Sequence, residues 1–255
     1  MMVTFGISTW SVHRSLQSGA LALQDLPAVM RRHGFEALHL CHFHLPSREP
    51  DALDAFDHQM KKSGVVLDAL LLDFGDISHP ETGARDVAEL EAWLPVAARL
   101  GARFVRISAG AQPPTDASLA RSAEHLMHLA KHAAAIGVRV ITENWHAMVP
   151  SPREVKRLTE LTEDHVPLCL DFGNWSGPEK YEWLEAIAPH AVSVHAKCAF
   201  AADGVADKGD FDRCLKILRD GHFAGTIAMI YDSPPADEWK HLDEELSYAC
   251  AAYDV

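Results

Sequence analysis

The chain has 255 residues, 48% of them hydrophobic, which is enough for one large α/β domain or two small ones. Its 23 basic and 36 acidic residues give a formal net charge of −13 at pH 7. An acidic chain gains no general electrostatic attraction to nucleic acid or to an anionic membrane. We therefore expect neither of these partners and favour a small-molecule ligand.

The cysteine pattern bears on the cellular compartment. Cys41, Cys169, Cys198, Cys214 and Cys250 are scattered, odd in number and never in a Cys-x-x-Cys pair. That pattern is typical of reduced thiols and indicates the cytoplasm. The chain starts directly with strand-like sequence rather than with a signal peptide, and no apolar run approaches the roughly 20 residues of a membrane span.

Strand-like and helix-like segments alternate along the whole chain. The expected strands are residues 3–8, 37–41, 65–72, 104–108, 139–143, 166–171, 191–197 and 226–231. The expected helices cover residues 23–32, 51–63, 81–100, 117–136 and 238–252, with three more that begin near Ser151, begin near Ser176 and end at Gly221.

Eight strands alternating with helices are the count of a (β/α)8 barrel. A doubly wound open sheet would share the alternation, but there is no Gly-x-Gly-x-x-Gly after the first strand and no P-loop lysine. Polar, charged and aromatic side chains follow the strands, at the end of the barrel where active sites lie. The turns at the other end, which follow the helices, contain mostly glycines that end those helices. We predict an α/β fold, a single (β/α)8 TIM barrel domain spanning residues 1–255.

Three successive strands end on a possible metal ligand, Glu143, Asp171 and His195. Side chains alternate along a strand, so these residues share a face with Ile141, Cys169 and Ser193, respectively. In parallel neighbours they would converge at one end of the sheet. An Asp at the end of a strand more often forms a turn, and a single His is more often a core residue. Three such residues at the ends of three successive strands favour a site for a divalent cation, Mn, Mg, Co or Zn.

Several longer motifs resemble a known family, the xylose-isomerase-like barrels of the sugar isomerase/epimerase superfamily, which also includes endonuclease IV. The motifs are Phe5-Gly-Ile-Ser-Thr9, Arg106-Ile-Ser-Ala-Gly110, Gly137-Val-Arg-Val-Ile-Thr-Glu143-Asn144, Leu170-Asp171-x-Gly173-Asn174 and Val194-His195-x-Lys197. The resemblance covers nearly the whole chain and implies the barrel fold, a metal-dependent activity on a sugar, and compatibility with a homo-oligomer. It discriminates poorly between reactions.

In this family, a Glu on strand five, an Asp on strand six, a His on strand seven and a Glu on strand eight hold the metal. The resemblance puts the first three on Glu143, Asp171 and His195, but the fourth position holds Ile230. Asp232 faces the same way about 7 Å further along the strand. It could bind metal through a water, bind substrate, or only start the Asp232-Ser-Pro-Pro turn.

The resemblance implies proton abstraction next to a carbonyl of a small keto-sugar or polyol, by an isomerase or epimerase. Family epimerases are thought to use the strand-five and strand-eight carboxylates as an acid/base pair. With Ile230 in place, a one-base reaction is favoured, in which Glu143 is ligand or base and His146 or Lys197 makes the second proton transfer. A sugar lyase or dehydratase and a non-catalytic sugar-binding relative stay open, whereas the charge and the missing extra ligands oppose an endonuclease.

Other strand-end residues are candidates for substrate binding. Trp10, Trp145 and Trp175 could form an aromatic wall for the C–H face of a sugar, or plug the barrel mouth. His42 could lie in a loop that covers the site, or be there by chance, and Asn174 could bind a hydroxyl, orient a ligand or form a turn.

Overall fold

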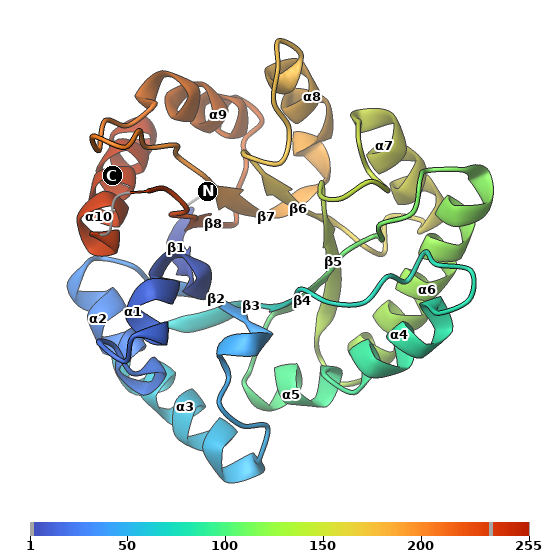
Figure 1. The fold of residues 1–255 in the computed structure, drawn as a ribbon, viewed down its shortest axis with the longest axis horizontal. Coiled ribbons are helices and arrows are strands. Elements are labelled where there is room, and N and C mark those ends of the chain that lie inside the picture. The colour runs from blue at the N-terminus through green and yellow to red at the C-terminus, as the bar shows by residue number, and fades with distance from the viewer. Residues whose placement is uncertain (1–2, 235–236, 255) are drawn as a thin grey trace.

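The computed structural model describes residues 3–234 and 237–254 and places eight strands in one closed, parallel barrel (Figure 1). Each strand pairs with the next, and β8 closes the barrel against β1. The strands are β1 (Thr4–Ser8), β2 (Ala37–Cys41), β3 (Val66–Leu72), β4 (Phe104–Ile107), β5 (Arg139–Glu143), β6 (Leu168–Asp171), β7 (Ala191–Ala196) and β8 (Thr226–Met229). The predicted barrel is confirmed.

The helices form a ring around the strands (Figure 1). They are α1 (His13–Gln17), α2 (Leu26–Arg32), α3 (Pro50–Ser63), α4 (Gly83–Glu91), α5 (Leu94–Arg99), α6 (Asp116–Ala135), α7 (Pro152–Leu161), α8 (Lys180–Ile187), α9 (Lys208–Asp220) and α10 (Glu238–Tyr253). None of the described helices is long and apolar enough to span a membrane.

The strands divide their side chains between two cores. Val140, Leu170 and Val194 belong to the large core between the strands and the helices. A smaller apolar cluster contains Ile141 and Cys169, the neighbours of Glu143 and Asp171 on their own strand faces. The alternation predicted from the sequence therefore holds, and it carries the polar strand ends to the same side of the sheet as this inner cluster.

Two predicted helices differ from the observed ones because of proline. The helix expected over residues 81–100 is two helices, and Pro95 lies in the first turn of the second. Proline has no N–H to donate and its ring clashes with the preceding turn, so a helix can begin but not continue there. Pro27 likewise lies in the first turn of α2, which begins at Leu26 after a short 3₁₀ turn (Leu23–Asp25) rather than at residue 23.

Candidate active site

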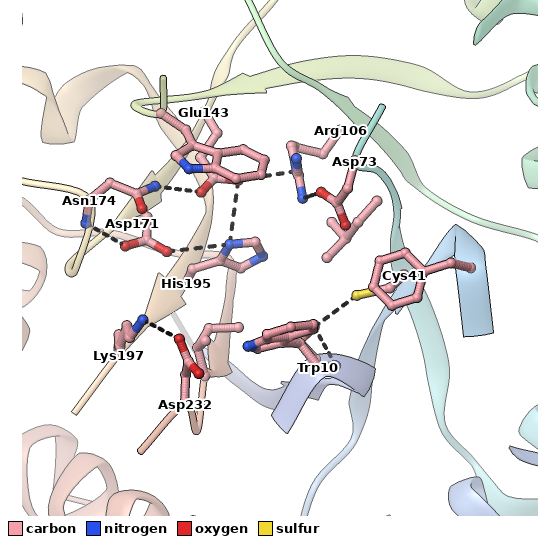
Figure 2. Close-up of a pocket in the computed structure, with 15 residues that line it drawn as sticks. Trp10, Cys41, Asp73, Arg106, Glu143, Asp171, Asn174, His195, Lys197 and Asp232 are labelled. Atoms are coloured by element: carbon pink, nitrogen blue, oxygen red, sulfur yellow. Dashed lines mark hydrogen bonds and ion pairs between the residues drawn. The ribbon is translucent and has the colours of Figure 1, made fainter. Parts of the chain in front are cut away.

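A cavity of about 330 Å³ opens at the carboxyl ends of the strands (Figure 2). Polar side chains line it from β4 to β7 and from the loops after β3, β6, β7 and β8, and apolar side chains line it from β3 and from the loops after β1, β2, β5 and β8. The residues that line it are Ser8, Trp10, Cys41, Phe43, Leu71, Asp73, Arg106, Glu143, Trp145, Asp171, Asn174, His195, Lys197, Ile230 and Asp232.

Glu143, the last residue of β5, is held in place from two directions. Asn174 donates a hydrogen bond from Nδ2 to Oε1 at 2.7 Å, and Arg106 Nε lies 3.1 Å from Oε2. Burial raises the pKa of Glu143, but the charges of Arg106 and His195 outweigh it and lower the pKa to about 2. The group is a carboxylate at any ordinary pH, and Oε2 has no hydrogen-bond donor among the described residues.

His195 on β7 lies between the two predicted carboxylate ligands. Its Nδ1 is 3.6 Å from Glu143 Oε2 and 3.7 Å from Asp171 Oδ2. Burial lowers the pKa of His195, but the neighbouring Cys169 and Glu143 and the hydrogen bond to Asp171 raise it well above 6.5. The two carboxylates that face Nδ1 therefore favour the protonated form of His195.

The other ring nitrogen of His195 belongs to a buried series of side-chain hydrogen bonds, which the sequence analysis did not predict. His195 Nε2 lies 2.9 Å from His39 Nδ1, and His39 Nε2 lies 3.0 Å from Asp68 Oδ2. Burial, the largest effect, lowers the pKa of His39, so His39 is neutral. The consistent assignment has His39 donating to Asp68 and His195 donating to His39, which leaves His195 Nδ1 to face the carboxylates.

Asp171 at the end of β6 is fixed by backbone donors. Its Oδ1 accepts from the N–H groups of Gly173 and Asn174 at 2.5 and 2.9 Å, which leaves Oδ2 directed at His195. The Asn144 side chain bonds both backbone groups of Asp171, accepting from N–H at 2.7 Å and donating to C=O at 3.0 Å. The ends of β5 and β6 are therefore held together by Asn144.

This donor set fits a divalent cation. Two ligands that each lie about 2.1 Å from an ion are separated by roughly 3 to 3.5 Å, close to the spacing from His195 Nδ1 to the two carboxylates. Ligand atoms of Glu143, Cys169 and His195 all lie within 4.8 Å of one another, so the buried thiol of Cys169 is a candidate that the sequence prediction missed. Asp171 is not part of this close group and approaches it only at His195. The buried Oε2 of Glu143, which lacks a donor, is the atom that such an ion would satisfy.

Arg106 is the most important lining residue that sequence reasoning did not predict. It lies on β4, donates to Asp73, and has its guanidinium carbon 5.1 Å from the centre of the Trp145 ring. Burial lowers the pKa of Arg106, but Glu143 and Asp73 raise it, so it is always charged. Its Nε and Nη1 lack hydrogen-bond partners in the described part of the chain. The signal was a lone arginine within the apolar strand Phe104-Val-Arg-Ile107.

The mouth of the cavity is partly apolar. Trp10 is 36% exposed, and Ile230 lies on the wall in the position where the family's fourth ligand was expected. Lys197 donates to Asp232 Oδ2 at 2.8 Å, and this contact, which outweighs burial, lowers the pKa of Asp232. Asp232 is therefore paired with Lys197, and Pro235 of the expected turn lies outside the described residues.

Three predicted site residues do not line this cavity. His146 follows Trp145 with a positive φ of 65° and stacks on its ring. His42 lines a neighbouring surface pocket with Phe74 and Trp93. Trp175 is buried and donates from its indole N–H to the carbonyl of Val149 at 3.3 Å.

A family model described as "Xylose isomerase-like TIM barrel" matches residues 27–248, and the chain belongs to this family. No curated protein matches the chain.

Solved structures resemble the chain over nearly its whole length. The chain is similar to an L-ribulose 3-epimerase, with 19% identity, a TM-score of 0.79, and coverage of 99% of this chain and 95% of that one. It is also similar to a probable 3-DHS dehydratase from Bacillus anthracis, with 15% identity, a TM-score of 0.75, and coverage of 96% and 98%. A protein from Mycobacterium smegmatis in complex with magnesium has 15% identity, a TM-score of 0.68, and coverage of 90% and 88%. At these identities the likeness shows the fold.

Proposed function

We propose that the protein is a metal-dependent sugar isomerase or epimerase, which abstracts a proton next to the carbonyl of a small keto-sugar or polyol. The observation that carries the proposal is the orientation of His195. The His39–Asp68 chain holds its Nε2, and its Nδ1 faces Glu143 and Asp171 at 3.6 and 3.7 Å. That arrangement supports the proposal, because a metal-ligating histidine is usually oriented by a hydrogen bond from its other ring nitrogen.

Glu143, Asp171 and His195 would hold the cation, with Cys169 beside them. A bound divalent ion would polarise a substrate carbonyl and so acidify the neighbouring C–H. Its identity is left among Mn, Mg, Co and Zn, because carboxylates, an imidazole and a thiol together suit more than one of them.

Arg106 supplies the second electrostatic feature. Arg106 lines the cavity with a buried, permanently charged guanidinium whose Nη1 has no hydrogen-bond partner among the described residues, and a buried donor is costly unless a ligand fills it. A substrate oxygen that gains negative charge on enolisation would fill it. Trp10, Phe43 and Trp145 would cover the apolar face of the sugar ring.

We divide the two proton transfers between Glu143 and Lys197. Glu143 is the cavity carboxylate that we assign as the base, but with a pKa of about 2 it suits a ligand better than a base. A bound cation would lower that pKa further, but it would also acidify the substrate C–H. On that ground we assign Glu143 both roles and give Lys197 the second transfer. Lys197 reaches the cavity from the end of β7 and carries a donor next to Asp232. His146 does not line the cavity and has no part in this scheme.

The apolar side chain of Ile230 favours a second candidate function, that of a lyase or dehydratase. Ile230 lines the cavity where a two-base epimerase would need its second carboxylate. Elimination of water from a keto-sugar needs one base and one acid on the leaving hydroxyl, and Glu143 with Lys197 meets that requirement.

The first test is elemental analysis of the purified protein with Asp171→Ala and a matched control, Asp232→Ala. We expect the wild type and Asp232→Ala to hold about one divalent ion per chain more than Asp171→Ala does. Asp232→Ala should keep this ion because Asp232 is paired with Lys197. Absence of metal from the wild type even after added ions would refute the proposal.

The metal-loaded protein is then incubated with keto-sugars in D₂O and followed by NMR. Exchange of the proton next to the carbonyl supports enolisation, and the product separates the two candidates: an isomeric sugar for the isomerase or epimerase, an unsaturated or deoxy product for the lyase. A metal-loaded protein that binds sugars without exchange would refute both and indicate a non-catalytic binding protein.

A further inference from the structure

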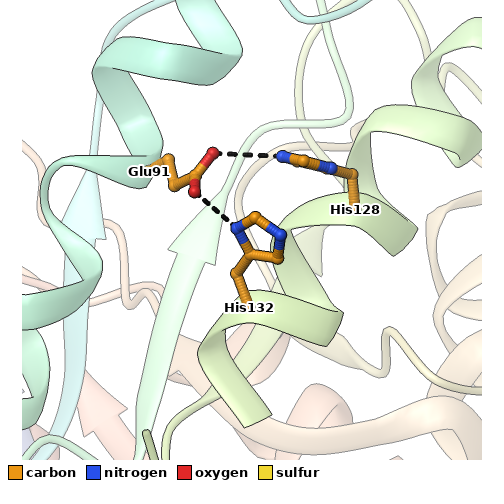
Figure 3. Close-up of side chains that lie close together, drawn as sticks. All are labelled: Glu91, His128 and His132. Atoms are coloured by element: carbon orange, nitrogen blue, oxygen red, sulfur yellow. Dashed lines mark hydrogen bonds and ion pairs between the residues drawn. The ribbon is translucent and has the colours of Figure 1, made fainter. Parts of the chain in front are cut away.

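A second group of metal-ligating side chains lies on the outside of the barrel (Figure 3). Glu91 is the last residue of α4, and His128 and His132 lie one turn apart on α6. Ligand atoms of the three residues all lie within 4.8 Å of one another. None of the three lines the active-site cavity, so this group is separate from the site proposed above.

Each imidazole faces a different oxygen of the same carboxylate. His128 Nε2 lies 3.0 Å from Glu91 Oε2, and His132 Nδ1 is hydrogen-bonded to Oε1. The two rings are 4.2 Å apart between centroids. All three side chains are partly exposed, and no lysine or arginine among the described residues pairs with Glu91. An ion from solution can therefore reach the three ligand atoms without displacing a competing cation.

The pair belongs to a polar stripe on α6. Arg121, His125, His128 and His132 are spaced by four, three and four residues, so they share one helix face. Arg121 donates to the carbonyl of Ser78 at 2.8 Å, and His125 Nδ1 donates to the carbonyl of Ile77 at 2.7 Å. These two residues fasten the loop before α4 through backbone groups. The two histidines further along meet a carboxylate instead, a group that prefers a cation.

We propose that Glu91, His128 and His132 form a Zn²⁺ site that clamps α4 to α6. Two imidazoles and one carboxylate, with a fourth position left for water, are a donor set that zinc accepts. The ion would replace the imidazole protons that now face Glu91, and the three ligand atoms, which lie within 4.8 Å of one another, would draw together around it. The competing explanation is a plain pair of carboxylate–histidine hydrogen bonds, which would hold no ion.

The test is calorimetric titration with zinc chloride of the wild type, His128→Gln/His132→Gln, Glu91→Gln and His125→Gln. His125 is the matched control, because it lies on the same stripe but binds a carbonyl. The wild type and His125→Gln should each bind one more zinc ion per chain than the double variant. Glu91→Gln should bind zinc at least tenfold more weakly at this site, since it loses the charged ligand.

Equal stoichiometry in the wild type and the double variant would overturn the proposal, as would loss of the same ion in His125→Gln. The Asp171→Ala variant distinguishes zinc bound in the barrel from zinc bound on the surface, because it should keep only the surface ion. Because the variants lie on the surface, unchanged circular dichroism is expected and shows that lost binding is not unfolding. Zinc should also raise the thermal midpoint of the wild type and of His125→Gln but not of the double variant.

Discussion

Replacing Arg106 by Met removes the charge that neutralises the buried end of β5. Arg106 and Glu143 are 3% and 4% exposed, and their charged atoms lie 3.1 Å apart. Removing one partner of such a pair leaves the other charge without compensation and costs about 3–5 kcal/mol. Methionine keeps much of the arginine stem, so lost packing is a small part of that figure.

The pKa of Glu143 leads to a similar magnitude. It falls from 4.5 to about 2 in the folded protein, and at about 1.4 kcal/mol for each pKa unit this is worth about 3 kcal/mol. A lowered carboxyl pKa gives stability that is present above pH 4.5 and is lost as the pH falls toward 2. In Arg106→Met the pKa of Glu143 rises, so stability should be lower at pH 7 and should change less across that window.

Urea unfolding of the wild type and Arg106→Met between pH 7 and pH 3 measures both effects. Arg99→Met is the matched control, because Arg99 pairs with Asp54 at 2.6 Å on the exposed surface and should change stability little. Arg106→Met/Glu143→Gln should recover part of the loss, since the uncompensated charge is gone. An Arg106→Met variant within about 1 kcal/mol of the wild type, with the same pH dependence, would refute the electrostatic reasoning.

Three further predictions concern metal binding and turnover. Asp68→Asn should weaken metal binding about 10- to 100-fold, because the amide no longer orients His39 and, through His39, His195. Competition with a chelator measures the metal affinity, and Asp232→Asn should leave it unchanged. The pKa of His195 is raised well above 6.5, so metal binding at neutral pH must release its proton; affinity should rise about tenfold for each pH unit until that pKa is passed, and calorimetry in buffers of different ionisation enthalpy should detect the released proton. Lys197→Met should lower kcat on an identified substrate about 10²- to 10⁴-fold while metal content stays constant.

Each of these predictions has a contrary result. Unchanged chelator competition in Asp68→Asn would mean that the buried chain only packs. An affinity independent of pH between 6 and 8 would mean that His195 is not a ligand or is already neutral. Full activity in Lys197→Met would reduce the Lys197–Asp232 pair to a structural contact at the mouth of the cavity.

The sequence alone determined the barrel and the approximate position of its site. Alternation of strand-like and helix-like segments depends on local hydrophobic periodicity, which one chain carries in full, so all eight strands were found within a few residues of their observed bounds. Glu143, Asp171 and His195 follow from the same rule, because parallel neighbouring strands bring their ends together. The break before Pro95 could also have been predicted, since its cause is local.

Only the tertiary structure decided which side chains meet in the cavity and which do not. Arg106 and Glu143 lie far apart in sequence and meet because β4 pairs with β5. His39 on β2 and His195 on β7 meet across the barrel because it closes. Trp175 and His146 looked like site residues because they follow strands, yet the turn after each strand directs them elsewhere. Periodicity specifies the face of a strand on which a side chain lies, whereas its partner across the barrel depends on how all eight strands close.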